Sequence, residues 1–315
     1  MTPEVPPTRP ALLRLIGGTP LIELPRLSPK PGVRIFAKLE GQNPSGSVKD
    51  RIALALVEQA EADGSLAKGQ TLVEASSGNT GIALAMVAKQ KGYPLKVVIP
   101  MEVVPSIADV FQLYGIEVVW CRSCVGMKSA IDRSQALAEE HGWHNVAQFT
   151  NPVNVRVHHD TTGAEIVEEL PEVDVFVAGI GTGGTLMGVG TRLREHNPRV
   201  QLVGVEPKLG DHLQGLRSLE EGYRPPLLDL DLLNGRMLVD SATAIAAAER
   251  VVREEGINAG VSAGATLAAA LRRAERMDRG NIVVMFSDGG WKYIPARPWD
   301  DARRGNEDLD NIHWW

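Results

Sequence analysis

Apolar residues along the chain fall into short runs that alternate with segments of helical spacing. Runs typical of strands occupy residues 21–24, 34–40, 71–75, 95–99, 116–120, 173–178, 201–205 and 281–286. Between them, apolar positions recur every three or four residues, which predicts helices over 52–62, 82–91, 106–114, 127–140, 162–170, 185–195, 242–255 and 265–274. Strands that alternate with helices through short connections are typical of parallel sheets covered by helices, so the pattern predicts an α/β fold.

The chain of 315 residues is long enough for two ordinary domains. A Pro- and Leu-rich stretch over 207–238 predicts a loop, and Asn151 and Pro152 mark a boundary. We therefore expect two domains with parallel-rich twisted sheets flanked by helices. They are a smaller, mobile domain over 36–152 that binds the substrate carboxylate, and a larger domain over 10–35 and 153–300 that binds a cofactor phosphate, followed by a tail over 301–315.

Charge and hydropathy exclude some classes of protein. The net charge is −6 with acidic and basic residues interspersed, so no nucleic-acid-binding surface is expected. No apolar run approaches the roughly 20 residues that a membrane-spanning helix needs. No secretory signal pattern opens the chain, so we expect a cytoplasmic protein that does not contact membranes.

The two cysteines, Cys121 and Cys124, form a CxxC motif. No second CxxC or His pair at metal-ligand spacing accompanies it, so no metal site is predicted. We expect two inert thiols in a loop; a reversible disulfide is the alternative.

The stretch from Asn43 to Arg51 (NPSGSVKDR) joins a strand to a helix. With Ser47 as the N-cap, Lys49 lies in the first turn of that helix. The positive end of a helix dipole disfavours an ammonium ion, and covalent chemistry by a lysine amine requires a lowered pKa. Lys49 is therefore a candidate for covalent catalysis, although a lone lysine is more commonly a solvated surface residue.

A glycine-rich loop follows a later strand. Gly179 to Gly184 match G-x-G-x-x-G before a helix, and Glu206 ends the next strand, which is the pattern of a dinucleotide site. The physics of such a loop is general, because its backbone amides approach an anion at a helix N-terminus. A phosphate monoester would be held equally well.

Residues 76–81 (SSGNTG) offer hydroxyl groups and an amide at another helix start. This set suits a carboxylate, with Gln148 closing over it; a cluster of helix-capping residues is the alternative. No role is predicted for His158 and His159, which are expected on a helix surface or in a loop. Asp288 is expected in a structural turn.

A reactive lysine, a phosphate-binding loop and a carboxylate-binding loop together indicate pyridoxal phosphate. This cofactor carries a phosphate and an aldehyde, and it acts on amino acids. A nicotinamide-dependent dehydrogenase is the alternative that the glycine loop suggests. It would leave the lysine and the carboxylate-binding loop without a role.

Five ordered motifs resemble the cysteine synthase family (O-acetylserine or O-phosphoserine sulfhydrylases, cysteine synthase B-like), within the fold type II pyridoxal-phosphate enzymes. The similarity runs from about Leu13 to Tyr293, and its motifs are GGTPL (17–21), NPSGSVKDR (43–51), SSGNTG (76–81), GTGGT (181–185) and GVSAG (260–264). The resemblance implies a tryptophan synthase β-like fold, and we expect a homodimer.

The resemblance also implies roles for single residues. Lys49 would be the Schiff-base lysine, Asn79 the partner of the cofactor's ring hydroxyl and Ser262 the partner of its ring nitrogen. The phosphate would be held by Gly181, Thr182, Gly183, Gly184 and Thr185. The substrate carboxylate would be held by Ser76, Ser77, Thr80 and Gln148.

The implied reaction is cysteine synthesis by β-replacement on an activated serine through an aminoacrylate, with Lys49 as general base. Arg217 lies in a segment similar to the branch that accepts O-phosphoserine, and it would pair bidentately with a phosphate leaving group. A surface arginine is the alternative, so O-acetylserine and O-phosphoserine both stay open, as does the sulfur donor.

Two other functions compete with cysteine synthesis. The first is β-replacement with homocysteine, as in cystathionine β-synthase, and the second is a catalytically silent binding protein. For Trp314 and Trp315 at the chain's end, the hypothesis is packing over the cleft or on a neighbouring subunit.

Overall fold

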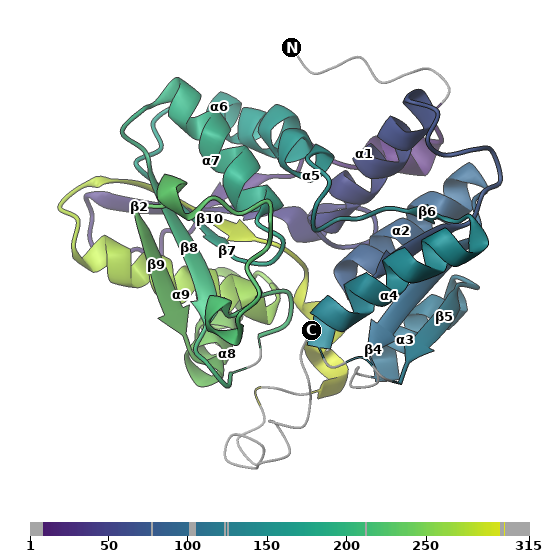
Figure 1. The fold of residues 1–315 in the computed structure, drawn as a ribbon. Coiled ribbons are helices and arrows are strands. Elements are labelled where there is room, and N and C mark those ends of the chain that lie inside the picture. Colours follow the sequence, from purple (N-terminus) through teal and green to yellow (C-terminus); the bar gives the residue numbers. More distant parts are fainter. Residues whose placement is uncertain are drawn as a thin grey trace.

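The structure of the protein is a computed structural model that describes residues 9–76, 78–100, 105–122, 124, 126–211, 213–296 and 299. The predictions for Ser77 and for the tail over 301–315, with Trp314 and Trp315, lie outside these residues. Helices and mostly parallel strands alternate along the chain (Figure 1), so the predicted α/β class is confirmed. Within the described ranges, no helix combines the length and the apolar composition that crossing a membrane requires.

The larger sheet has six strands in the order β1-β2-β10-β7-β8-β9. Only β1 is antiparallel to its neighbour, and the other pairings are parallel, with Ile282 opposite both Ile35 and Val175. The strands are β1 (Leu21–Glu23), β2 (Val33–Leu39), β10 (Gly280–Phe286), β7 (Val175–Gly179), β8 (Gln201–Pro207) and β9 (Gly235–Val239).

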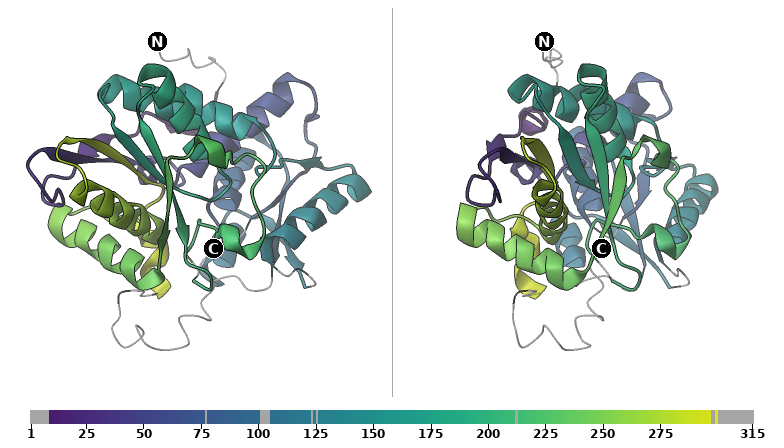
Figure 2. Two further views of the ribbon diagram at one scale, coloured as in Figure 1. Left: turned by 60° about the vertical axis from the view of Figure 1, so that its left-hand side comes forward. Right: turned by 90° about the vertical axis from the view of Figure 1, so that its left-hand side faces the viewer.

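Helices cover both faces of this sheet (Figure 2). Along β7, Val175 and Val177 pack on the side of α8 (Ser241–Arg250) and α9 (Val261–Glu275). Phe176 and Ala178 pack on the opposite side, with α6 (Ala164–Glu169) and α7 (Gly184–His196). Because both faces of the strand are buried, its sequence is continuously apolar rather than alternating.

The smaller sheet has the order β5-β4-β3-β6 and is parallel throughout. Its strands are β5 (Glu117–Cys121), β4 (Leu95–Pro100), β3 (Leu72–Ala75) and β6 (His144–Asn145). Its helices are α1 (Lys49–Ala62), α2 (Asn79–Lys91), α3 (Pro105–Leu113) and α4 (Gly126–His141). The central helix α2 is apolar on nearly all sides because α1 and the sheet enclose it.

Two segments depart from simple α-helix. α5 (Val153–Val157) leads into a π-helical turn, η3 (His158–Gly163), and α8 leads into a second one, η6 (Val251–Glu255). Short 3-10 helices lie at η1 (Ala11–Leu15), η2 (Glu40–Gln42), η4 (Leu219–Glu221), η5 (Leu230–Leu232) and η7 (Gly290–Ala296).

Three local predictions differ from the structure. The expected loop over 207–238 contains the start of β9, an edge strand that buries few of its side chains and therefore lacks a strong apolar pattern. The N-cap of α1 is Val48 rather than Ser47, whose Oγ accepts a hydrogen bond from the Lys49 backbone at 3.3 Å. Cys121 and Cys124 form a disulfide, so the prediction of two free thiols was wrong. The turn after β5 brings their Cα atoms to 5.3 Å, within the range that a disulfide spans.

The two sheets account for the two expected units, but the division into domains stays a prediction. The boundary placed at residue 36 falls inside β2, which belongs to the larger sheet. The boundary near residue 152 falls immediately before α5.

Candidate active site

Two adjoining cavities lie where the carboxyl ends of strands from both sheets meet. Lys49, Asn79 and the Gly181–Thr182 step line both of them. The first cavity also brings in Ser76, Thr80, Gln148 and Arg217, and the second brings in Gly183, Thr185 and Ser262. The carboxyl edge of parallel strands is where α/β proteins bind ligands. The structure therefore gathers into one cleft nearly all the side chains that the sequence singled out.

Lys49 is the first residue of α1 and lines both cavities. Burial and the nearby guanidinium group of Arg217 lower the pKa of Lys49 to about 8. Among the described residues, no carboxylate lies within ion-pair distance of its amine. The amine is therefore neutral in a substantial fraction near pH 8, as a covalent role requires.

The glycine-rich loop connects β7 to α7, which begins at Gly184. A Cβ on Gly181 would lie 2.8 Å from the Gly215 carbonyl oxygen, and Gly183 has φ +88°. Both positions therefore require glycine, for close approach at Gly181 and for left-handed backbone at Gly183. The free backbone N–H groups at the start of α7 suit an anion such as phosphate.

His158 supports this loop, although its sequence context predicted a place on a helix surface or in a loop, without a role. Its side chain is fully buried in η3, with Nε2 3.1 Å from Thr185 Oγ1 and Nδ1 3.0 Å from Thr162 Oγ1. Burial, together with the charges of Lys49 and Arg51, lowers the pKa of His158 well below its usual range. A neutral imidazole therefore orients the Thr185 hydroxyl group.

In the alternative of a dinucleotide site, the carboxylate of Glu206 would bind a ribose hydroxyl group. This carboxylate is fully buried, and it accepts hydrogen bonds from Arg236 at 2.8 Å and from the Leu219 backbone at 2.7 Å. Both of its oxygens are hydrogen-bonded within the protein, so neither is available to a ribose. The structure therefore does not support a dinucleotide site.

The loop after β3 forms the other wall of the cleft. Ser76 Oγ accepts a hydrogen bond from the Gly81 backbone at 2.9 Å. Thr80 donates to Gln148 Oε1 at 2.7 Å, and Gln148 Nε2 donates to the Ala75 carbonyl at 3.2 Å. Gln148 is thus joined to this loop by two hydrogen bonds, and its closing over a substrate carboxylate stays a prediction.

Two buried polar residues that were not predicted hold these loops together. Asn154 Nδ2 donates to the Gln148 carbonyl at 2.8 Å and to Thr182 Oγ1 at 3.0 Å, linking the two walls of the cleft. Glu74 accepts hydrogen bonds from the Ala75 and Gln148 backbones, and burial raises its pKa to about 7. Glu74 lies within an apolar strand run, which gives no sequence signal for such a role.

Arg217 faces the cleft from the loop after β8. Its guanidinium carbon lies 5.3 Å from the Phe149 ring centroid and 5.9 Å from that of Tyr223. In the described part of the chain no carboxylate comes within ion-pair distance of it, and Glu221 acts on it only from further away. An incompletely paired guanidinium beside a lysine amine is suited to bind an anion.

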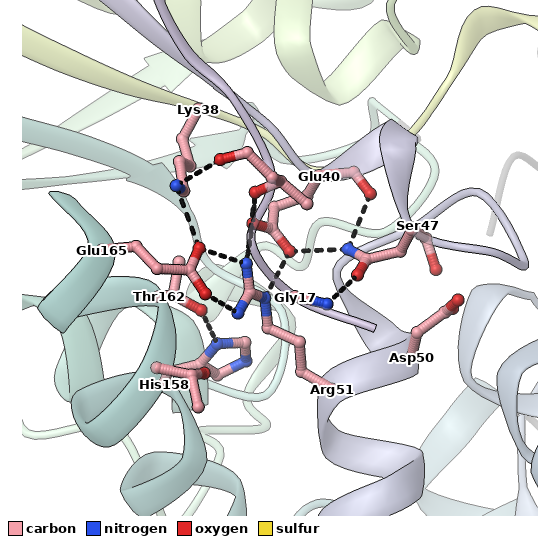
Figure 3. A network of polar contacts seen from close by, with 12 residues as sticks. Gly17, Lys38, Glu40, Ser47, Asp50, Arg51, His158, Thr162 and Glu165 are labelled. Atoms are coloured by element: carbon pink, nitrogen blue, oxygen red, sulfur yellow. Dashed lines mark hydrogen bonds and ion pairs between the residues drawn. The ribbon is translucent and has the colours of Figure 1, made fainter. Parts of the chain in front are cut away.

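A buried ion-pair network behind the cleft fixes the direction of α1. Figure 3 shows the Arg51 guanidinium group between the carboxylates of Glu40 and Glu165, with nitrogen–oxygen distances of 2.6–2.8 Å. Lys38 Nζ lies 3.0 Å from Glu165, and Thr19 donates to Glu40 at 2.6 Å. The GGTPL motif and the lysine helix are therefore parts of one polar cluster, which sequence spacing could not reveal.

Pyridoxal phosphate fits this set of groups. The glycine-rich loop and the start of α7 match its phosphate, the weakly basic Lys49 amine matches its aldehyde, and Ser262 in the first turn of α9 lines the same cavity.

Comparisons with known proteins agree with this geometry. The model of the family described as "Pyridoxal-phosphate dependent enzyme" matches residues 12–288. A cysteine synthase of Staphylococcus aureus (strain Mu50 / ATCC 700699) is 39% identical over 302 residues, covering 92% of this chain and 97% of the relative. An O-ureido-L-serine synthase of Streptomyces lavendulae is 38% identical over 308 residues, covering 95% of each chain.

Among solved structures, O-acetyl serine sulfhydrylase isoform 3 of Entamoeba histolytica superposes with a TM-score of 0.86 at 31% identity, covering 99% of this chain and 98% of that one. The resemblance to cysteine synthases and the fold type are confirmed. The chain belongs to the family of pyridoxal-phosphate dependent enzymes.

Proposed function

We propose that the chain is a cysteine synthase, which replaces the β-substituent of an activated L-serine by a sulfur nucleophile. One observation carries the proposal: the Lys49 amine, with its pKa lowered to about 8, lines a cleft between the loop of Ser76 and Thr80 and the glycine-rich loop. The names of relatives at 39% and 31% identity support the same chemistry.

Pyridoxal phosphate, when bound, supplies the electron sink that accepts negative charge from the substrate's α-carbon. Lys49 removes the α-proton as general base and returns it after the nucleophile has added. The loop of Ser76 and Thr80, with Gln148 across it, binds the substrate carboxylate and thereby orients the α-proton towards Lys49.

Ser262 is the proposed partner of the cofactor's ring nitrogen. A neutral hydroxyl group at this position does not hold the nitrogen protonated, as an aspartate would. The weaker electron sink disfavours a long-lived carbanion, so it suits elimination and replacement at the β-carbon rather than transamination.

We propose O-phosphoserine as the preferred donor, because Arg217 offers its guanidinium group to the cleft beside Lys49. A guanidinium group can donate two hydrogen bonds to one phosphate, and each hydrogen bond to a charged group contributes about 1.5–3 kcal/mol to binding. Arg217→Ala is expected to lower kcat/KM for O-phosphoserine roughly 10- to 100-fold and to change that for O-acetylserine much less.

Arg224→Ala is the matched control for this experiment. Arg224 lies in the same loop region, but its guanidinium group is engaged with the Leu228 carbonyl at 3.1 Å. If Arg217→Ala slowed both donors equally, recognition of phosphate by Arg217 would be rejected.

The nucleophile separates cysteine synthesis from its alternatives. Sulfide and thiosulfate test the proposal, homocysteine tests cystathionine formation, and N-hydroxyurea tests formation of the O-ureido product that the relative at 38% identity is named for. Product masses are compared for each nucleophile with both serine esters. Absence of a cysteine-yielding product with every sulfur donor, in protein loaded with cofactor, would overturn the proposal.

The unit of the smaller sheet with α1–α4 is the proposed moving part, since it carries the carboxylate-binding loop on a separate core. Closure of this unit would exclude water from the reacting groups. The homodimer and the cytoplasmic location stay predictions, to be checked by sedimentation and by cell fractionation.

A further inference from the structure

Asn79 is in contact with a buried lysine, Lys292, which belongs to none of the motifs described above. Lys292 lies in η7, with only 2% of its side chain exposed. Its ammonium group donates a hydrogen bond to Asn79 Oδ1 and lies 3.5 Å from the Gly46 carbonyl oxygen. On the other side of the same amide, Asn79 Nδ2 donates to Asp288 Oδ2 at 2.8 Å.

These two contacts determine which way the Asn79 amide points. An amide has one acceptor oxygen and one NH₂ group with two donor hydrogens. Turning it over would set the NH₂ group against the Lys292 ammonium and the oxygen against the Asp288 carboxylate, and both contacts would be repulsive. One hydrogen of Nδ2 is used by Asp288, and the second has no partner in the part of the chain that the structure describes. Asn79 itself lines both cavities beside Lys49.

We propose that Lys292 and Asp288 are positioning residues, which fix the Asn79 amide so that its remaining N–H donates to an anionic oxygen on the cofactor ring. The ammonium group at Oδ1 also withdraws electron density from the amide, which strengthens Nδ2–H as a donor. The proposal rests on the cofactor that the proposed function uses, but not on the donor or the nucleophile of the reaction.

Three backbone hydrogen bonds join the segment around Asp288 to two other segments of the site. Val48 N–H donates to the Ser287 carbonyl at 2.8 Å, and Gly289 N–H donates to the Gly46 carbonyl at 3.3 Å. Gly260 N–H, at the start of α9, donates to the Asp288 carbonyl at 3.1 Å. The segment that carries Asp288 and Lys292 is therefore held in register with both the Lys49 turn and the Ser262 helix.

The residues around the Asp288 carboxylate are packed closely against it. A Cβ on Gly260 would lie 2.0 Å from Asp288 Oδ1, so only glycine leaves room for it. Tyr293 donates to Asp288 Oδ2 at 3.0 Å, whereas Oδ1 is buried without a hydrogen-bond partner among the described residues. Burying charges is costly unless they are well paired. The buried charges of Lys292 and Asp288 both contact Asn79, which lines the cleft. Their burial is therefore better explained by the orientation of Asn79 than by a gain in stability.

The test uses the full-length Lys292→Met variant, in which a flexible apolar side chain replaces the ammonium group. We expect cofactor affinity to fall at least 10-fold in titrations of the apoenzyme, and the visible absorption maximum of the loaded protein to shift. Lys292 Nζ lies 4.0 Å from Asp288 Oδ2 and 5.3 Å from the Trp291 ring centroid. The matched control is Lys96→Met on β4, where the lysine also lies beside a carboxylate (Glu117, 2.6 Å) and an indole ring (Trp143, 4.9 Å). The control should change neither quantity.

A double-mutant cycle decides whether Lys292 acts through Asn79. In an Asn79→Ala background, Lys292→Met should cause no further change in cofactor affinity or absorption maximum. An equal loss in both backgrounds, or a lower melting temperature with affinity and spectrum unchanged, would overturn the proposal.

If Lys292→Met does not fold, Lys292→Gln and Asp288→Asn provide the same readouts with smaller changes in shape. Lys292→Gln retains a donor towards Asn79 Oδ1, so a partial recovery of the spectrum is expected. None of these measurements uses a sulfur donor. A failure of cysteine formation alone would therefore count against the proposed function and leave this inference standing.

Discussion

The guanidinium group of Arg217 faces the same cleft as the Lys49 amine, whose pKa is lowered to about 8 by burial and, to a smaller extent, by the charge of Arg217. The two residues belong to different units, since Lys49 begins α1 and Arg217 lies in the loop between β8 and β9. The positive charge of Arg217 thus adds to the effect of burial in favouring the neutral amine of Lys49.

The first prediction concerns pH. Only the neutral amine of Lys49 reacts with the cofactor's aldehyde, so the rate of cofactor capture by the apoenzyme should rise with pH, with a midpoint near 8. Arg217→Ala removes a positive charge, which raises the pKa of Lys49 and moves the midpoint upward. Stopped-flow absorbance between pH 6 and about 10 measures the midpoint. Arg224→Ala should leave it in place, and an unmoved midpoint in Arg217→Ala would contradict the assignment.

The second prediction concerns the buried network of Figure 3. Arg51→Met leaves the buried Glu40 carboxylate without its guanidinium partner, so the free energy of unfolding should fall by about 3–5 kcal/mol. Arg34→Met is the control, because Arg34 forms the same two-bond pair with Glu23 at the surface. There the loss should be much smaller, because water screens an ion pair between exposed side chains. Urea denaturation compares the two, and similar losses would refute the special role of the buried pair.

The third prediction concerns the glycine-rich loop. In Gly181→Ala the new methyl group meets the Gly215 carbonyl oxygen at 2.8 Å, so the loop must shift away from the phosphate position. We expect cofactor affinity to fall at least roughly 10-fold with little change in secondary structure. Gly235→Ala is the control, since a Cβ on Gly235 has no heavy atom within 4 Å. Undiminished affinity in Gly181→Ala would remove this loop from the cofactor site.

The fourth prediction concerns Glu74, whose pKa is raised to about 7 by burial. The folded protein favours the protonated acid more than the unfolded chain does. Its contribution to stability is therefore fully present below about pH 4.5 and is lost as pH rises through about 7. The total loss is on the order of 3 kcal/mol.

Glu74→Gln is neutral at every pH, so its melting temperature should decline less than that of the wild type between pH 5 and about 8. Glu117→Gln, at an exposed position on the neighbouring β5, serves as control. Identical pH profiles for Glu74→Gln and the wild type would contradict the raised pKa.

Local signals in the sequence were sufficient to predict most helices and strands, and to single out most of the residues that line the cleft. The central strands of the larger sheet are apolar because both of their faces are covered, and the glycine-rich loop carries Gly181 where its backbone comes close to that of Gly215. β9 escaped prediction because an edge strand buries too little to impose a pattern. The residues behind the cleft escaped it because their partners are distant in the chain: Arg51 with Glu165, His158 with Thr185 and Lys292 with Asn79.

By itself, the sequence determined the α/β class, the strand–turn–helix position of Lys49 and the places of the two loops that we propose to bind anions, because each depends on neighbours within a few residues. Only the tertiary structure decided which of these groups share a cleft, that Arg217 lowers the pKa of Lys49, and that buried charges orient Asn79 and α1. Those properties depend on distances between side chains that lie far apart in the chain, and on the exclusion of water when they meet.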